Sequence, residues 1–217
     1  MGSPVDELIA RARAFRSESF VQRQALYQRL AREGQSPKTL MISCSDSRVD
    51  PSAIFDTEPG EIFMVRNVAS LVPPYTPDAH CHGTSAALEF GVVGLGVAHV
   101  IVLGHSHCGG IDVLLRGADE GEQTTDFIGS WLSCANRVRD QVVTDMLDAT
   151  YAEKARALEY EAVRQSIRNL RTFPWIDERV RQGELWLHGW HFDIATGALC
   201  AVAETGGPGQ VSWLSGP

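Results

Sequence analysis

Residues 97–110, which read VAHVIVLGHSHCGG, indicate the fold most clearly. The apolar run 97–103 predicts a buried strand, and the segment from Gly109 onward predicts the start of a helix. The polar residues between them therefore follow the carboxyl end of a strand. In open parallel sheets, ligands bind at that edge.

Working outward, strands alternate with helices along most of the chain, which is typical of a mostly parallel sheet. The predicted strands are 39–43, 61–65, 97–103 and 185–190, and the predicted helices include 84–95, a helix from 109, and segments within 125–148 and 151–171. A turn at Thr196-Gly197 predicts a late hairpin. We therefore expect an α/β fold: a mostly parallel central β-sheet flanked by helices, with a late antiparallel edge strand.

The beginning of the chain differs from the rest, because residues 5–33 have helical spacing with a break at Ser17-Glu18-Ser19 and an end at Gly34. This pattern predicts an N-terminal helical arm over residues 1–34. We find neither an internal repeat nor an inter-domain linker. Residues 1–217 are therefore expected to form a single domain.

Composition excludes several classes of protein. The chain has 217 residues and a formal net charge of −8, which argues against nucleic acid and anionic membranes as partners. No apolar run approaches the ~18 residues of a membrane span, and the first residues contain no signal-peptide core. Five cysteines cannot all pair, so we expect a reducing cytoplasm in which thiols bind metals, catalyse or pack.

Two polar segments carry the chemistry. Cys44-Ser45-Asp46-Ser47-Arg48 follows the first predicted strand, and residues 104–110 follow the strongest one. The fold thus brings Cys44, His105 and Cys108 to one edge of the sheet. Two thiolates and one imidazole suit Zn²⁺ and leave a fourth position for water, as in catalytic zinc sites.

Asp46 and Arg48 lie next to this predicted site in the sequence. A carboxylate there can either ligate the metal or accept a hydrogen bond from a zinc-bound hydroxide, and Arg48 can hold it with a bidentate pair. Zinc with two thiolates carries no net charge, so it should lower the pKa of water less than zinc with three histidines does. Activity should then rise toward alkaline pH.

With these residues in place, the sequence resembles the β-class carbonic anhydrases from about Ala25 to Asp193. The resemblance is carried by the segments 34–38, 44–48, 58–61, 66–69, 72–75, 104–110 and 188–190. Cys-x-Asp-x-Arg followed about sixty residues later by His-x-x-Cys is a specific combination. The resemblance implies reversible hydration of CO₂ to bicarbonate and a proton by zinc-bound hydroxide.

The resemblance also implies roles for individual residues. Cys44, His105 and Cys108 would bind one Zn²⁺ per subunit, and Asp46 with Arg48 would orient the hydroxide. The positions that shape the CO₂ pocket are Gln35, Phe63, Val68 and the Gly109 N–H, together with Phe90, which stands where plant-like members usually have tyrosine.

Family resemblance further implies assembly and the absence of one form of regulation. A homodimer or a larger assembly (tetramer or octamer) is expected, with N-terminal helices wrapping the neighbour and pockets built partly across the interface. The bicarbonate-regulated subgroup has tryptophan, arginine and tyrosine where this chain has Met41, Arg66 and Phe192. The plant-like, non-bicarbonate-regulated subgroup is therefore expected.

Alternatives stay open at this point. The same scaffold could hydrolyse carbonyl sulfide or carbon disulfide, an idea that Phe90 favours slightly, or the chain could be a non-catalytic zinc- or bicarbonate-sensing module. His107 could be a proton shuttle or an exposed loop histidine. His80-Cys81-His82 could bind a second metal, although a polar loop segment is the simpler interpretation, and Cys134 and Cys200 are expected to pack.

Overall fold

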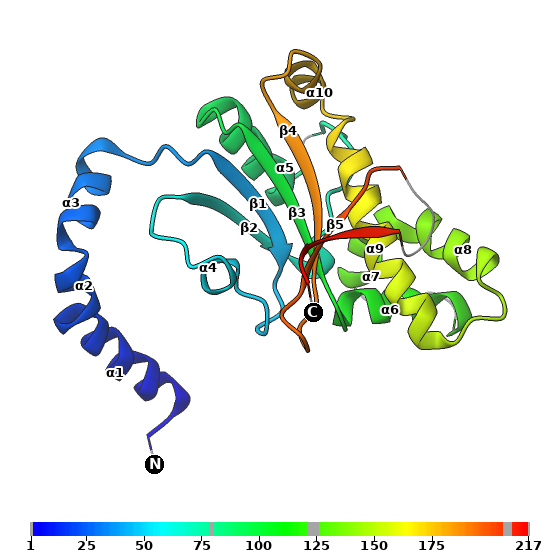
Figure 1. Cartoon of the computed structure of the whole chain (residues 1–217), viewed down its shortest axis with the longest axis horizontal. Helices are drawn as coiled ribbons and strands as arrows, with labels where there is room; N and C mark the ends of the chain where they lie inside the picture. The colour runs from blue at the N-terminus through cyan, green and yellow to red at the C-terminus, as the bar shows by residue number, and fades with distance from the viewer. Residues whose placement is uncertain (1, 79, 121–125, 206–209, 217) are drawn as a thin grey trace.

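The computed structural model describes residues 2–78, 80–120, 126–205 and 210–216 and contains a six-stranded sheet in the order β2-β1-β3-β4-β5-β6 (Figure 1). The strands are β1 (Thr39–Cys44), β2 (Ile62–Asn67), β3 (His99–His105), β4 (Trp186–Phe192), β5 (Leu199–Val202) and β6 (Val211–Ser215). The first four run parallel, β5 pairs antiparallel with β4, and β6 pairs antiparallel with β5. The expected α/β architecture is confirmed. The late edge contains two strands rather than one, and the outer strand β6 was not predicted.

Helices flank the sheet as expected. They are α1 (Pro4–Ser17), α2 (Ser19–Gln22), α3 (Gln24–Glu33), α4 (Pro51–Ile54), α5 (Gly83–Glu89), α6 (Gly109–Glu120), α7 (Ile128–Leu132), α8 (Asn136–Asp145), α9 (Tyr151–Leu170) and α10 (Pro174–Arg181), with short η helices at Val68–Ser70, Phe90–Gly94 and Ser133–Ala135. Sequence analysis did not predict α4 or α10. In the described parts of the chain, none of the helices combines the length and apolar character needed to cross a lipid bilayer.

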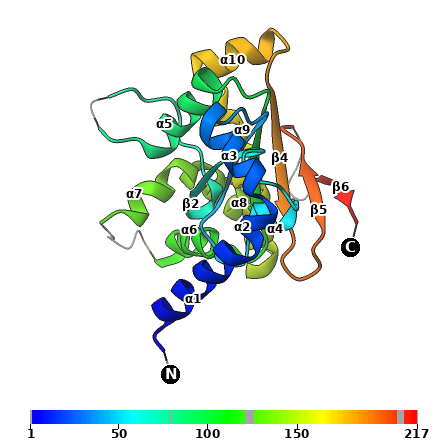
Figure 2. The same cartoon turned by 90° about the vertical axis from the view of Figure 1, so that its left-hand side faces the viewer.

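Helices α1, α2 and α3 form the predicted arm, which extends away from the sheet (Figures 1 and 2). Ser3 caps α1 in a reciprocal box with Asp6, and Gly34 ends α3 with a φ of 78°. The expected break occurs at Glu18, and a second, unexpected break occurs at Arg23. None of the residues in these three helices is buried within the chain.

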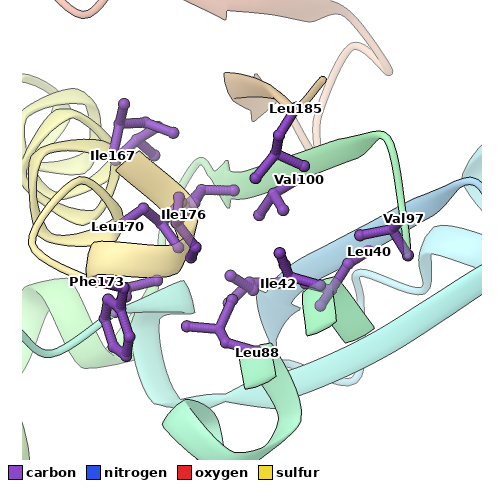
Figure 3. Close-up of a cluster of buried hydrophobic side chains, with 14 of the residues drawn as sticks. Leu40, Ile42, Leu88, Val97, Val100, Ile167, Leu170, Phe173, Ile176 and Leu185 are labelled. Atoms are coloured by element: carbon purple, nitrogen blue, oxygen red, sulfur yellow. The ribbon is translucent and has the colours of Figure 1, made fainter. Parts of the chain in front are cut away.

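The main core lies between one face of the sheet and helices α5, α9 and α10 (Figure 3). Its centre includes Leu40, Ile42, Leu88, Val100, Ile167, Leu170, Phe173, Ile176 and Leu185. Helix α9 approaches β3 and β4 at two glycines, since a Cβ at Gly104 would lie 2.6 Å from a Val163 methyl and one at Gly189 would lie 2.9 Å from another. Close packing therefore fixes β3 directly before His105.

Candidate metal centre

Three candidate ligands meet at the carboxyl edge of the sheet. Cys44 is the last residue of β1, His105 is the last residue of the adjacent parallel strand β3, and Cys108 directly precedes α6. All three side chains are buried, and their ligand atoms lie within 4.8 Å of one another. Neighbouring parallel strands that end at the same level thus bring together residues about sixty positions apart.

The imidazole of His105 is oriented for coordination. Its Nδ1 lies 2.9 Å from the carbonyl oxygen of Ser106, so the proton sits on Nδ1 and Nε2 is left as an acceptor. Within the described part of the chain, Nε2 is one of two buried side-chain nitrogen or oxygen atoms without a hydrogen-bond partner. A buried, unpartnered imidazole nitrogen beside two thiols fits a metal ligand.

The two thiols interact strongly. Their Sγ atoms are 3.9 Å apart, and a hydrogen bond with Cys108 lowers the pKa of Cys44. That same hydrogen bond, together with burial, raises the pKa of Cys108. One thiolate therefore forms readily and opposes the second. A divalent cation between the sulfur atoms would remove that opposition, because it neutralises both charges.

Asp46 and Arg48 form a bidentate ion pair next to the ligands. Arg48 Nε donates to Asp46 Oδ1 at 2.9 Å, and Nη2 donates to Oδ2 at 2.7 Å. The guanidinium holds the pKa of the Asp46 carboxyl well below its usual range. Asp46 Oδ2 lies 4.0 Å from Nε2 of His105, so an ionised carboxylate faces the ligand group.

His107 lies in the loop between two candidate ligands and has a φ of 56°, in the left-handed region. Its carbonyl oxygen accepts a hydrogen bond from Arg48 Nη2 at 2.9 Å, while its side chain is exposed. Two further non-glycine residues with positive φ, Ala69 and Ser70, follow β2 beside the same site. Unfavourable backbone conformations are thus concentrated around the candidate ligands, which is common at functional sites.

Arg66 organises the loop that carries Cys44, a role that sequence analysis missed. Its guanidinium donates to the carbonyl oxygens of Cys44, Asp46 and Val49 at 2.9, 2.7 and 2.8 Å. These bonds use main-chain acceptors, which leave no pattern in a sequence. Arg66 is thereby bound to main-chain oxygens of its own chain. Met41, two residues before the Ser43 that pairs with Arg66, is a buried apolar side chain.

Comparison with known proteins agrees with this geometry, since the carbonic anhydrase family model matches residues 39–199. The chain belongs to the β-carbonic anhydrase family. It is 38% identical over 189 residues to beta carbonic anhydrase 5, chloroplastic, of Arabidopsis thaliana, covering 87% of this chain and 62% of that protein. It is 37% identical over 186 residues to beta carbonic anhydrase 3 of the same plant, covering 85% and 71%. The chain thus spans less than two thirds of the first relative.

Solved β-carbonic anhydrases have the same fold. The structure of CcaA superposes with a TM-score of 0.86 at 34% identity, covering 92% of this chain and 88% of that one. A tetrameric β-carbonic anhydrase from Sordaria macrospora superposes with a TM-score of 0.81 at 28% identity, covering 97% and 100%.

The residues expected to shape the pocket of this β-carbonic anhydrase separate into two groups. Val68 and Gly109 lie near the candidate ligands: Val68 follows Asn67, which pairs with Cys44 in the sheet, and a Cβ on Gly110 would lie 2.8 Å from Val68.

Phe63, in contrast, pairs with Leu40, so it lies ~13 Å back along the strands from Cys44. The ring of Phe90 is 5.6 Å from that of Phe63, and Gln35 precedes β1. Within a single chain, the residues Gln35, Phe63 and Phe90 therefore do not lie at the metal centre of that chain.

The remaining candidates lie elsewhere. His80 and His82 both contact Asp78 Oδ1, at 3.2 and 2.7 Å, and all three side chains are exposed together with Cys81. This arrangement is a polar loop, as the simpler interpretation had it. Cys200 is buried in the main core, and Cys134 is half-buried beside Trp131.

Proposed function

We propose that this chain catalyses the reversible hydration of CO₂ to bicarbonate and a proton, with one Zn²⁺ held by Cys44, His105 and Cys108. The observation that carries the proposal is the group of two buried thiols and an unpartnered imidazole nitrogen beside an ionised carboxylate. When bound, Zn²⁺ supplies a Lewis acid that lowers the pKa of water, so that water can add to CO₂ near neutral pH.

The chain's own groups position the reactants. Asp46 accepts a hydrogen bond from the attacking water at a carboxylate oxygen, and Arg48 keeps that carboxylate ionised and fixed in orientation. The backbone N–H of Gly109, at the start of the twelve-residue helix α6, orients an oxygen of CO₂ or bicarbonate. Val68 provides an apolar wall that suits CO₂.

A second copy of the chain would complete the pocket. Gln35, Phe63 and Phe90 lie away from their own metal centre, and Phe90 is exposed. The arm supports assembly, because Leu8, Ile9 and Phe15 are apolar yet exposed on helices that bury nothing within the chain. The name of the Sordaria macrospora relative describes a tetramer. We therefore propose a homodimer or a larger homo-oligomer.

We also propose that residues 1–217 act as a single domain in the cytoplasm. All five cysteines are free thiols, which supports a reducing compartment. The candidate ligands themselves require reduced sulfur, because a disulfide cannot bind zinc as two thiolates do.

The primary test is stopped-flow CO₂ hydration by the zinc-loaded protein from about pH 7 to about pH 9, with a chelator-treated control. We expect rapid turnover that rises with pH and disappears on removal of zinc. The rise is expected because Cys44 and Cys108, as thiolates, would neutralise the charge of bound zinc, which would then lower the pKa of water less than zinc held by three neutral histidines does.

Two results would contradict this assignment. Turnover of carbonyl sulfide without turnover of CO₂ would indicate the sulfur-substrate hydrolase, which Phe90 in place of the usual tyrosine favours slightly. Stoichiometric zinc with turnover of neither substrate would indicate a sensing module.

We further propose that His107 passes the product proton to buffer, which its exposed imidazole next to the Asp46–Arg48 pair supports. His107→Asn is the appropriate variant, because asparagine tolerates the left-handed backbone and preserves the carbonyl contact with Arg48. In weak buffer, kcat should fall about tenfold or more while kcat/KM is unchanged, and added imidazole should restore kcat. A kcat that is equal to wild type at every buffer concentration would exclude this role.

A further inference from the structure

We infer that Ser106 is a positioning residue that connects helix α9, through the turn at Asp193, to the candidate metal ligand His105. The inference rests on the proposed zinc binding at Cys44, His105 and Cys108. It concerns how the chain holds one ligand in place before any metal arrives. No part of the sequence pattern points to it, since Ser106 resembles any small residue between two ligands.

Ser106 is fully buried, and its N–H, its hydroxyl oxygen and its carbonyl oxygen each have a defined partner. Its N–H donates to the carbonyl oxygen of Phe192 at 2.9 Å. Its Oγ accepts a hydrogen bond from the N–H of Ile194 at 2.8 Å. Its carbonyl oxygen accepts from Nδ1 of His105 at 2.9 Å. Ser106 is therefore held by hydrogen bonds with Phe192 and Ile194, the residues on either side of Asp193 at the end of β4.

The last of these bonds determines what His105 can do. Because Nδ1 is committed to the Ser106 carbonyl, Nε2 is the nitrogen left for a metal, and the ring plane is fixed by the same contact. A rotation of the Ser106 peptide would move that carbonyl and release the ring. The two bonds from Ser106 to Phe192 and Ile194 oppose such a rotation.

The turn after β4 is itself anchored to α9. Oδ1 of Asp193 accepts hydrogen bonds from the N–H groups of Ala195 and Thr196, both at 3.0 Å. Oδ2 forms an ion pair with Nη2 of Arg156 on α9, also at 3.0 Å. One carboxylate thus shapes the turn and ties it to a long helix that packs on the sheet.

On α9, this connection continues from Arg156 to the buried carboxyl group of Glu159. Glu159, one helical turn after Arg156, is almost fully buried and lies 3.5 Å from the Arg156 guanidinium. Nε2 of the fully buried His191 lies 3.1 Å from the Glu159 carboxylate. Separating the buried Glu159 carboxyl group from His191 is costly, so α9 and the end of β4 keep one relative position. Ser106 conveys that position to His105.

The first experiment compares Ser106→Ala with Ser43→Ala. Both remove a fully buried serine hydroxyl next to a candidate ligand, but Ser43 Oγ has no hydrogen-bond partner among the described residues, which makes it a matched control. Zinc affinity is measured by competition with a chromogenic chelator, and the ligand field by the absorption spectrum of the cobalt-substituted protein. Ser106→Ala should weaken zinc binding about 10–100-fold and shift the cobalt bands, whereas Ser43→Ala should do neither.

The second experiment tests the route. Asp193→Asn retains an acceptor for the turn but removes the charge that pairs with Arg156, and it keeps the size of a side chain that is not fully buried, so the variant should fold. It should weaken zinc binding in the same direction. In a double-mutant cycle, Ser106→Ala and Asp193→Asn should cost less together than the sum of their separate effects, because both act on one connection.

The outcomes are distinct. Additive effects, or an Asp193→Asn protein with wild-type zinc affinity and cobalt spectrum, would overturn the inference even if Ser106→Ala failed to fold. Equal losses in Ser43→Ala and Ser106→Ala would overturn it as well, because any buried serine would then matter. Absence of zinc from the wild-type protein would instead contradict the proposed function.

Discussion

His105→Ala is expected to give a folded protein that contains no stoichiometric zinc and hydrates CO₂ no faster than the chelator-treated wild type. The substitution removes the one neutral ligand and leaves two buried thiols, Cys44 and Cys108, whose Sγ atoms are 3.9 Å apart. Their ionisations oppose each other, so the remaining pair would hold a metal weakly at neutral pH. The loss of affinity should far exceed the ~10–100-fold that loss of an outer hydrogen-bond partner costs.

The measurement is zinc content by atomic absorption on the purified protein, alongside stopped-flow hydration and far-UV circular dichroism. Cys44→Ala should behave in the same way. Cys134→Ala is the matched control for removal of a thiol, since Cys134 is half-buried and donates to the carbonyl oxygen of Trp131 outside the metal centre. It should keep one zinc per chain. Full zinc content in either His105→Ala or Cys44→Ala would refute the ligand assignment.

These ligands could be predicted from the sequence because strand ends carry positional information. Apolar runs identified the strands that end at Cys44 and His105, and the parallel arrangement placed both ends at one edge of the sheet. The pair Asp46–Arg48 could also be predicted from the sequence, because both residues lie in the one short loop that follows the strand ending at Cys44. Local pattern and global topology agreed at this edge, and both pointed to one site.

Other features left no such signal. Helices α4 and α10 are short and start at prolines, so too few residues repeat for an apolar period to stand out. Strand β6 is largely exposed on both sides and lacks the alternation that identifies a half-buried strand. Arg66 and Ser106 act through main-chain partners, which any residue type provides.

The pocket residues show a different limit. Family resemblance assigned Gln35, Phe63 and Phe90 to the CO₂ pocket and implied a pocket built partly across an interface, without saying which residues come from which chain. The register of β1 with β2 puts Phe63 level with Leu40 rather than with Cys44, so Phe63 does not lie at the metal centre of its own chain. The separation in the structure is what makes a second copy the natural source.

Asp46→Asn is expected to retain zinc and to lose turnover by about 10²–10³-fold. Asparagine keeps the size of the side chain but replaces one acceptor oxygen by a donor and removes the charge that Arg48 pairs with. The attacking water would then lack an ionised acceptor at the position it needs. Zinc is retained because Asp46 is held by Arg48 and is not among the three candidate ligands.

Asp50→Asn is the matched control, because Asp50 lies four residues away and caps α4 through an acceptor that asparagine also provides. It should leave zinc content and turnover at wild-type levels. Turnover of Asp46→Asn equal to that of Asp50→Asn would remove Asp46 from the mechanism.

The pH profile distinguishes orientation from titration at Asp46. Since the hydrogen bonds from Arg48 hold the pKa of the Asp46 carboxyl well below its usual range, the group is ionised throughout the range from about pH 7 to about pH 9. It cannot be the group whose loss of a proton makes activity rise. The Asp46→Asn profile should therefore be lower at every pH while its midpoint stays that of the wild type. A profile that becomes flat would instead identify Asp46 as the base that titrates, and would mean that Arg48 does not control its charge.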